Sequence, residues 1–194
     1  MLAVMRIIAG THRSRPLVPP ADQKVTRPIT DRVKQAMFDR LWSLGALEAS
    51  HALDLFAGTG SLGLEALSRG VERVTFVERD RDARARLESN LATLGLVPRA
   101  SVLAVDVLGA TWLAVVQASG PGLVFCDPPY RLWSEAKGPD RLTHTLERTA
   151  TVAADGAVLV LRTDSHTPPP TLPAWDSPST HTYGSMSLHF YRRA

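Results

Sequence analysis

The sequence predicts an α/β fold: a doubly wound, mostly parallel sheet with an antiparallel hairpin at its C-terminal edge, preceded by a small N-terminal basic arm. Three observations predict it. Strand and helix patterns alternate from residue 52 to about residue 162, which indicates βαβ units. A glycine-rich turn follows the first of these strands. Two further strand patterns, residues 180–183 and 187–192, meet across a short turn that begins at Gly184.

We expect one globular domain, with the arm over residues 1–30 and the core over residues 31–194. A chain of 194 residues, 44% hydrophobic and 21% charged, is typical of a soluble protein with a sizeable core. No apolar run approaches membrane-spanning length. The single cysteine, Cys126, fits a cytoplasmic location. The six histidines form no spaced Cys/His cluster, so we predict no metal site.

The arm concentrates positive charge. Through residue 40 there are eight basic and three acidic residues, a net charge of +5 in a chain of +3. Taken alone, such a segment is most often a solvated charged surface. Residues 5–9 and 16–19 predict a small hairpin or an extended arm. The helix predicted over residues 31–44 has Thr30 as its N-cap and one apolar face directed at the core, formed by Val33, Met37, Leu41 and Leu44.

The glycine-rich turn joins a predicted strand, residues 52–56, to a predicted helix, residues 61–68. Its glycines match the spacing G-x-G-x-x-G, which lets a ligand approach the backbone closely. The cofactor is then either a nicotinamide dinucleotide or S-adenosylmethionine. Asp54 favours the second, because a carboxylate there repels a pyrophosphate but suits an ammonium group. We expect four residues of this region to contact the cofactor: Asp54, Phe56, Gly58 and Gly60.

Two acids follow the next two predicted strands, residues 74–77 and 101–105. Glu78 stands twenty residues after Gly58, where an acid can accept both hydroxyls of a ribose. Asp106 is placed to accept a hydrogen bond from an adenine amino group, although taken singly it is equally well a solvated acid. We expect both acids, and Val107 beside Asp106, to contact the cofactor.

The most informative residues are Asp127-Pro128-Pro129-Tyr130, after a buried strand predicted over residues 123–126. The prolines end the strand and stiffen the loop. Proline has a carbonyl but no N–H group, so the loop presents acceptors with few competing donors. An exocyclic NH2 group of a base fits such a loop, and the ring of Tyr130 offers a surface on which that base can stack.

These motifs, in this order, resemble the class I S-adenosylmethionine-dependent methyltransferases that act on amino groups of bases. The segments 6–10, 13–17 and 27–33 and the glycine block 56–70 are similar to the signature of the RsmD family. The resemblance covers nearly the whole chain. That family methylates N2 of one guanine in bacterial 16S rRNA. The resemblance implies a Rossmann-like fold and S-adenosyl-L-methionine as cofactor. It also implies 16S rRNA as partner, within a partly or fully assembled small ribosomal subunit.

The chain departs from the family pattern in three places. Ser14 stands where the family usually has glycine between two basic residues, and Ile29 replaces a more usual threonine. These two bear on details of RNA contact. Residues 162–164 read Arg-Thr-Asp where relatives commonly carry glutamates. Because they lie far in sequence from the catalytic motif, we expect this third departure to matter little.

The resemblance implies direct methyl transfer. We expect Asp127 and the Pro128 carbonyl to accept the N–H bonds of the guanine amino group, and Tyr130 to stack on the base. The catalytic candidates are Asp127, Pro128, Pro129 and Tyr130. With a base-modifying site behind it, the basic arm favours a phosphate backbone. The RNA-binding candidates are Arg6, Arg13, Arg15, Arg27 and Arg32.

Three alternatives remain at this stage. A DNA adenine-N6 methyltransferase also acts on an exocyclic amine, and only the N-terminal signature and the lack of a target-recognition domain argue against it. A non-catalytic nucleic acid-binding module is disfavoured because Asp54, Gly58, Gly60, Glu78 and Asp127 are all intact. A nicotinamide oxidoreductase is the most distant, since nothing resembles a hydride-transfer site.

Overall fold

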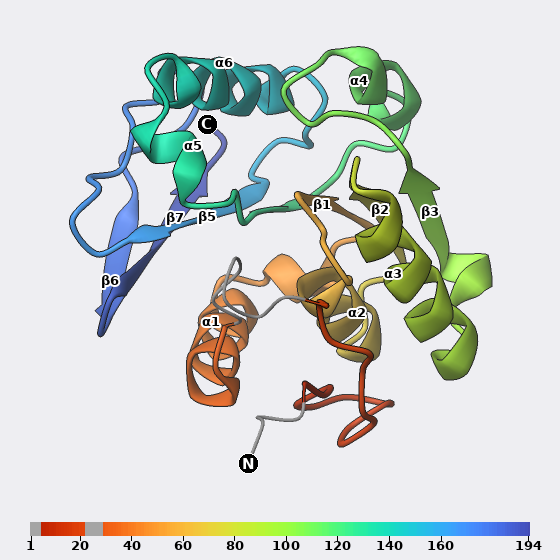
Figure 1. The fold of residues 1–194 in the computed structure, drawn as a ribbon. Coiled ribbons are helices and arrows are strands. Elements are labelled where there is room, and N and C mark those ends of the chain that lie inside the picture. The colour runs from red at the N-terminus through yellow and green to blue at the C-terminus, as the bar shows by residue number, and fades with distance from the viewer. Residues whose placement is uncertain (1–4, 22–28) are drawn as a thin grey trace.

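The computed structural model describes residues 5–21 and 29–194. Its centre is a seven-stranded sheet in the order β3-β2-β1-β4-β5-β7-β6 (Figure 1). The strands β1 to β5 are parallel to one another, and β7 runs antiparallel to both of its neighbours. The strands are β1 His51–Leu55, β2 Arg73–Val77, β3 Ala100–Leu103, β4 Leu123–Cys126, β5 Val158–Asp164, β6 Ser179–Tyr183 and β7 Met186–Arg192. The predicted doubly wound sheet and its antiparallel C-terminal hairpin are therefore confirmed.

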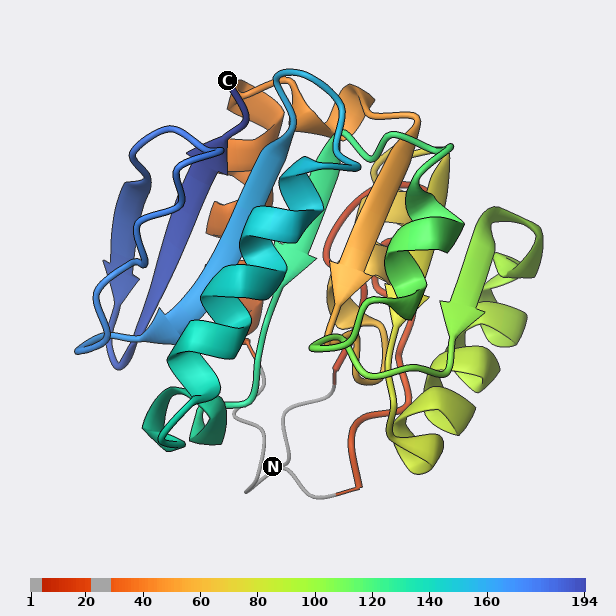
Figure 2. The same ribbon diagram turned by 90° about the horizontal axis from the view of Figure 1, so that it is seen from above.

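Helices cover both faces of the sheet, so the core has two halves. One half of the core lies between the sheet and the helices α1, α2 and α3 (Figure 1). The other half lies between the opposite face of the sheet and the helices α4 and α6 (Figure 2). The residues of β4 alternate between the two halves and are all buried, which explains its continuous apolar run. The helices are α1 Asp31–Ser43, α2 Ser61–Ser68, α3 Arg81–Leu94, α4 Thr111–Val116, α5 Arg131–Ser134 and α6 Gly138–Ala150, with short 3-10 turns at Ala46–Glu48 and Val97–Arg99.

Local sequence signals account for several element ends. The Thr30 side chain accepts a hydrogen bond from the Val33 N–H, so the predicted N-cap of α1 is confirmed. Cys126 ends β4 as a small residue, 1% exposed, directly before the Asp127 loop. By contrast, β3 ends at Leu103, earlier than predicted. The Asp106 carboxylate accepts a hydrogen bond from the Leu108 N–H at 3.0 Å, which turns the chain there.

The N-terminal segment forms a short hairpin with one antiparallel bridge, between Arg6 and Pro16. Ile7 is fully buried against the core. Gly10 has φ +82°, and a Cβ at this position would stand 1.9 Å from the Ser68 carbonyl oxygen, so only glycine fits. Ser14 also has a positive φ, 66°, a conformation that favours glycine, the residue that the resemblance led us to expect at this position.

None of the helices within residues 5–21 and 29–194 is long and apolar enough to cross a membrane. Over the same residues, no group of three or more His, Cys, Asp and Glu side chains is arranged to hold a metal ion.

Candidate active site

A cavity of about 800 Å³ opens at the carboxyl edge of the five parallel strands. This is the edge at which open α/β sheets bind ligands. Ten of the eleven predicted cofactor and catalytic residues line it, although their loops are up to 76 positions apart. They are Asp54, Phe56, Gly58, Glu78, Asp106, Val107, Asp127, Pro128, Pro129 and Tyr130. The structure thus brings together residues that the sequence suggested one motif at a time.

The remaining residue, Gly60, does not line the cavity but shapes the turn beneath it. Its φ is +87°, and a Cβ there would stand 2.4 Å from Cδ1 of Leu87 on α3. At Gly58, with φ +55°, the position of a Cβ has no atom within 4 Å, so the backbone faces open space. A Cβ at Gly63 would stand 2.3 Å from the Phe76 ring, so this glycine allows α2 to pack closely on β2. The three glycines therefore serve three different purposes.

Phe56 adds strain at the start of the same turn. Its φ is 59°, a left-handed backbone conformation that residues other than glycine, asparagine and aspartate rarely adopt. Strained residues of this kind concentrate at ligand sites, where the surrounding structure holds them in place. Nothing in the sequence pattern predicted this conformation.

Asp54 is buried at the end of β1 and ties the strand to the first helix after it. Its Oδ2 accepts a hydrogen bond from the Gly63 N–H at 2.9 Å. Burial raises the pKa of Asp54 to about 8, the hydrogen bond from Gly63 opposes this, and the nearby charge of Asp127 adds to it. A positive ligand group in the cavity would favour the ionised form of this carboxyl.

The two other acids each bind backbone amides of the chain. The oxygens of Glu78 accept hydrogen bonds from the N–H groups of Gly58 and Asp80, each at 2.8 Å. Asp106 forms an ion pair with Arg79, Nη1 to Oδ2 at 3.0 Å. A carboxylate has about four lone-pair sites, so both acids retain capacity to accept bonds from a ligand.

The Asp-Pro-Pro-Tyr loop leaves β4 and turns directly into α5. The Asp127 N–H is 3.4 Å from the Leu55 carbonyl oxygen, which ties the loop to the end of β1. The Pro129 carbonyl accepts a hydrogen bond from the Leu132 N–H at 2.9 Å and so begins α5. This leaves the Pro128 carbonyl and the Asp127 carboxylate as the acceptors best suited to a ligand amine.

Comparison with known proteins identifies the family. The family model described as Conserved hypothetical protein 95 matches residues 5–192. An Escherichia coli (strain K12) protein named Ribosomal RNA small subunit methyltransferase D is 34% identical over 190 residues, which are 97% of this chain and 90% of that protein. The chain belongs to the RsmD family. A Haemophilus influenzae protein of the same name is 39% identical over 130 residues, 65% of this chain and 64% of that protein.

Solved structures agree with this assignment. The Escherichia coli protein yhhF matches with a TM-score of 0.78 and 33% identity, and the match covers 98% of each chain. The fold of this RsmD family member is therefore the Rossmann-like fold of the class I methyltransferases, as the sequence predicted.

Arg162 on β5 is a residue whose importance the sequence reasoning missed. Its Nε lies 2.7 Å from Oδ1 of Asp127, and its guanidinium carbon lies 5.7 Å from the centre of the Tyr130 ring. Arg162 therefore lies beside the catalytic motif, so distance in sequence was not a sound reason to expect little from the departure at residues 162–164. Sequence distance was misleading, because β4 and β5 are adjacent parallel strands.

Four of the five predicted RNA-binding arginines are described, and these four lie outside the cavity lining, on and beside the N-terminal segment. Arg6 forms an ion pair with Asp31, Nε to Oδ2 at 2.9 Å, and remains half exposed. Arg15 is exposed and donates to the Thr93 carbonyl at 3.3 Å. Arg13 and Arg32 are exposed as well. Arg27 lies outside the described residues, and the RNA-binding role of all five remains a prediction.

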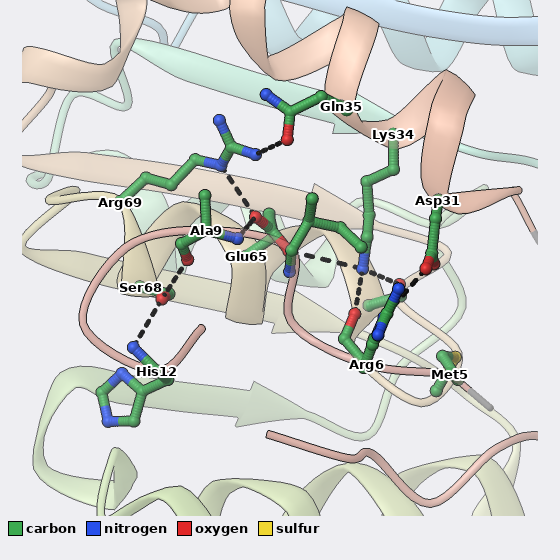
Figure 3. A network of polar contacts seen from close by, with 12 residues as sticks. Met5, Arg6, Ala9, His12, Asp31, Lys34, Gln35, Glu65, Ser68 and Arg69 are labelled. Carbon is green, nitrogen blue, oxygen red and sulfur yellow. Dashed lines mark hydrogen bonds and ion pairs between the residues drawn. The ribbon is translucent and has the colours of Figure 1, made fainter. Parts of the chain in front are cut away.

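A buried network fixes this segment to the core (Figure 3). The Glu65 carboxylate on α2 accepts hydrogen bonds from the backbone N–H groups of Ile8, at 2.7 Å, and Ala9, at 3.0 Å. It also pairs with Arg69, at 2.7 Å, and with Lys34, at 3.4 Å. The arm is therefore held firmly against α2, the helix that begins at the glycine turn.

Proposed function

We propose that this protein transfers the methyl group of S-adenosylmethionine to the N2 amino group of a guanine in 16S rRNA of the small ribosomal subunit. The observation that carries the proposal is the convergence of Glu78, Asp106 and the Asp127 loop on one cavity of about 800 Å³. Such a volume is ample for a nucleoside-sized ligand with a base beside it.

The cavity residues fit the cofactor. Gly58 leaves open space beside the backbone, and Glu78 retains lone pairs for ribose hydroxyls. Asp106 has the acceptor that an adenine amino group needs. Asp54 lies near the turn, and a positive ligand group there favours its ionised form. When bound, S-adenosylmethionine supplies a methyl group already activated by its sulfonium sulfur.

The chain's own residues then position the base. The amino lone pair of guanine is delocalised into its ring, so N2 is a poor nucleophile. Acceptance of both N–H bonds by Asp127 and the Pro128 carbonyl favours the pyramidal nitrogen, and this preference grows toward the transition state. Tyr130 holds the ring by stacking, so that orientation contributes a large part of the rate.

The choice of rRNA is supported by the relatives. The name of the Escherichia coli relative places its activity on small-subunit ribosomal RNA, and the match runs through 97% of this chain. An exocyclic amine alone is compatible with either guanine N2 or adenine N6. The N-terminal signature, together with the firmly held basic arm, favours guanine in a large RNA substrate.

The product can be tested directly. Purified protein and labelled S-adenosylmethionine are incubated with unmodified small-subunit particles, naked small-subunit RNA, large-subunit RNA and DNA. We expect label as N2-methylguanosine in small-subunit RNA, detected by nucleoside mass spectrometry. Label in N6-methyladenine, or only in DNA, would overturn the proposal. N2-methylguanosine in large-subunit RNA would retain the chemistry but contradict the substrate.

The cofactor is tested separately by calorimetry. S-adenosylmethionine or its demethylated product should bind, and NAD should not. Replacing Glu78 with Ala should weaken binding by about 1–3 kcal/mol, because charged hydrogen bonds to the ribose are lost. Binding of NAD in place of S-adenosylmethionine contradicts the assignment.

A further inference from the structure

One arginine contacts both chemistry-bearing residues of the Asp-Pro-Pro-Tyr loop. Arg162 pairs with Oδ1 of Asp127 at 2.7 Å and lies over the Tyr130 ring at 5.7 Å. Its side chain is only 9% exposed, so it is held by the protein rather than by solvent.

Strand register brings these residues together. In the parallel pair of β4 and β5, Cys126 stands opposite Leu161. One step further along each strand are Asp127 and Arg162, at the carboxyl edge where the cavity opens. On its other side Arg162 is paired with Leu188 of the antiparallel β7, so its backbone is fixed from both directions. The ion pair thus joins β5 to the residue directly after the end of β4.

We propose that Arg162 is a positioning residue for methyl transfer: it engages one oxygen of Asp127, leaves the other for the substrate amine, and braces the ring on which the base stacks. The proposal rests on the proposed function. A carboxylate bound at one oxygen by a nearly buried guanidinium loses rotational freedom, so the second oxygen is pre-oriented. The same guanidinium, over the Tyr130 ring, restrains that ring by a cation–π contact.

The charge of Arg162 also acts on the ionisation of Asp127. Burial raises the pKa of Asp127, and the charge of Arg162 and its contact with Oδ1 oppose that rise. Within the described residues, the ionisable groups whose charges act on this carboxyl are Arg162 from β5, Asp54 from β1 and Cys126 from β4. Arg131, Glu135 and Arg141 also line the cavity. Arg162 is the cation in contact with Asp127, so its loss leaves Asp127 beside another buried acid. An ionised Asp127 accepts an N–H bond, whereas a protonated one presents a competing donor.

The contact is particular to chains with a base at this position. Where a relative carries glutamate there, two carboxylates would meet and repel, and the loop would need another support.

The test compares Arg162→Met, which keeps length without charge, with Arg162→Lys, which keeps charge without the guanidinium. Arg73→Met is the matched control, because Arg73 is exposed at the amino end of β2, away from the cavity. Single-turnover methyl transfer to small-subunit particles is measured from pH 5 to 9 at saturating cofactor. Arg162→Met should lose about 100-fold in rate at pH 7, typical of a misplaced catalytic group. The acid limb of its profile should move to higher pH.

Arg162→Lys should lose less rate than Arg162→Met and keep its acid limb near that of the unchanged protein. The control Arg73→Met should match the unchanged protein in both rate and acid limb. Cofactor affinity should change by less than about threefold in all variants, since Arg162 acts on the base side. An unchanged rate and limb in Arg162→Met overturns the proposal. So does an equal loss of rate in both Arg162 variants without movement of the limb, which indicates a packing role only.

A measurement without substrate separates this proposal from the proposed function. The carboxyl carbon of Asp127 is followed by NMR titration, with its signal assigned from an Asp127→Asn spectrum. The signal should titrate at higher pH in Arg162→Met, and an unchanged titration overturns the electrostatic role. If the unchanged protein methylates no nucleic acid, the proposed function fails instead. If Arg162→Met does not fold, the NMR titration and the pH profile of Arg162→Lys decide. Lysine keeps the positive charge, so the acid limb should stay near that of the unchanged protein. An acid limb that moves to higher pH although the charge is kept contradicts the role of that charge.

Discussion

The network beneath the N-terminal arm and the carboxyl edge of the sheet both bury a carboxylate beside a cation, yet they use it differently. Glu65 is fully buried and is satisfied by two backbone N–H groups and two cations (Figure 3). The Asp127 side chain is 23% exposed, has one arginine partner and faces the cavity. A carboxylate whose bonding capacity is used up within the protein stabilises the fold, whereas one with an oxygen left over can serve a substrate.

Asp54 lies between these two cases. It is 1% exposed like Glu65, but it accepts one hydrogen bond, from Gly63, and its environment is acidic rather than basic. Its raised pKa is the physical consequence, because burial without a counter-charge disfavours the ionised form. The three acids together suggest that the number of partners, more than burial, separates structural from functional carboxylates here.

The largest effect is expected from Glu65→Ala. It leaves Lys34 buried without its counter-charge and removes the acceptor of two arm amides, so the free energy of unfolding should fall by about 3–5 kcal/mol. Urea denaturation measures it. The double variant Lys34→Met with Glu65→Leu is the control and should lose less, since no charge is stranded. A loss below about 1 kcal/mol in Glu65→Ala would break the comparison.

Asp127→Ala should show the opposite profile. We expect single-turnover methyl transfer to fall about 10²–10³-fold, as for loss of a group that stabilises the transition state. Cofactor affinity should change little, because the side chain faces the base rather than the cofactor. Folding stability should fall less than in Glu65→Ala, because Asp127 is 23% exposed whereas Glu65 is fully buried. Calorimetry of cofactor binding provides the control. Parallel losses of affinity and rate would place Asp127 in the cofactor pocket.

The raised pKa of Asp54 predicts that the folding stability of the ligand-free protein depends on pH. The unfolded chain loses the Asp54 proton near pH 3.8, whereas the folded chain retains it up to about pH 8. The stabilisation is therefore complete below about pH 4 and is lost as pH rises toward 8, at no more than about 1.4 kcal/mol per pH unit.

Asp54→Asn sharpens this measurement. The asparagine oxygen can still accept from the Gly63 N–H but does not titrate, so its denaturation curves should show a flatter dependence on pH. If the two proteins follow the same slope between pH 4 and 8, Asp54 is ionised in the folded chain and does not differ from Glu65 in the way described.

The smallest effect per residue is expected at the arm. Arg13→Gln and Arg15→Gln should each weaken RNA binding and reduce its salt dependence by about one unit of slope per lost phosphate contact. Because the Glu65 network holds the arm, this loss should come from charge and not from disorder of the segment. Titrations of labelled small-subunit RNA at several salt concentrations measure it, with Arg73→Gln as the exposed control. Unchanged slopes would mean that these arginines are solvated.

Much of the fold followed from local pattern. The alternation of strands and helices, the Thr30 cap and the C-terminal hairpin were predictable because each depends on residues close together in the chain. The cavity was predictable for a related reason. Each motif ends a parallel strand, and parallel strands direct their carboxyl ends to one edge.

Other features depended on which segments pack together. The contact of Arg162 with Asp127 required the register of β4 against β5. Glu65 acquired two of its four partners from the arm, 56 and 57 positions earlier in the chain. Gly60 was predicted from a cofactor motif, and the structure adds that a Cβ at this position would stand too close to Leu87. The sequence by itself thus determined the family, the order of the elements and the chemistry at strand ends, since short-range patterns encode them. Only the tertiary structure decided which buried charges are satisfied and which are left for a ligand, because that depends on long-range contacts.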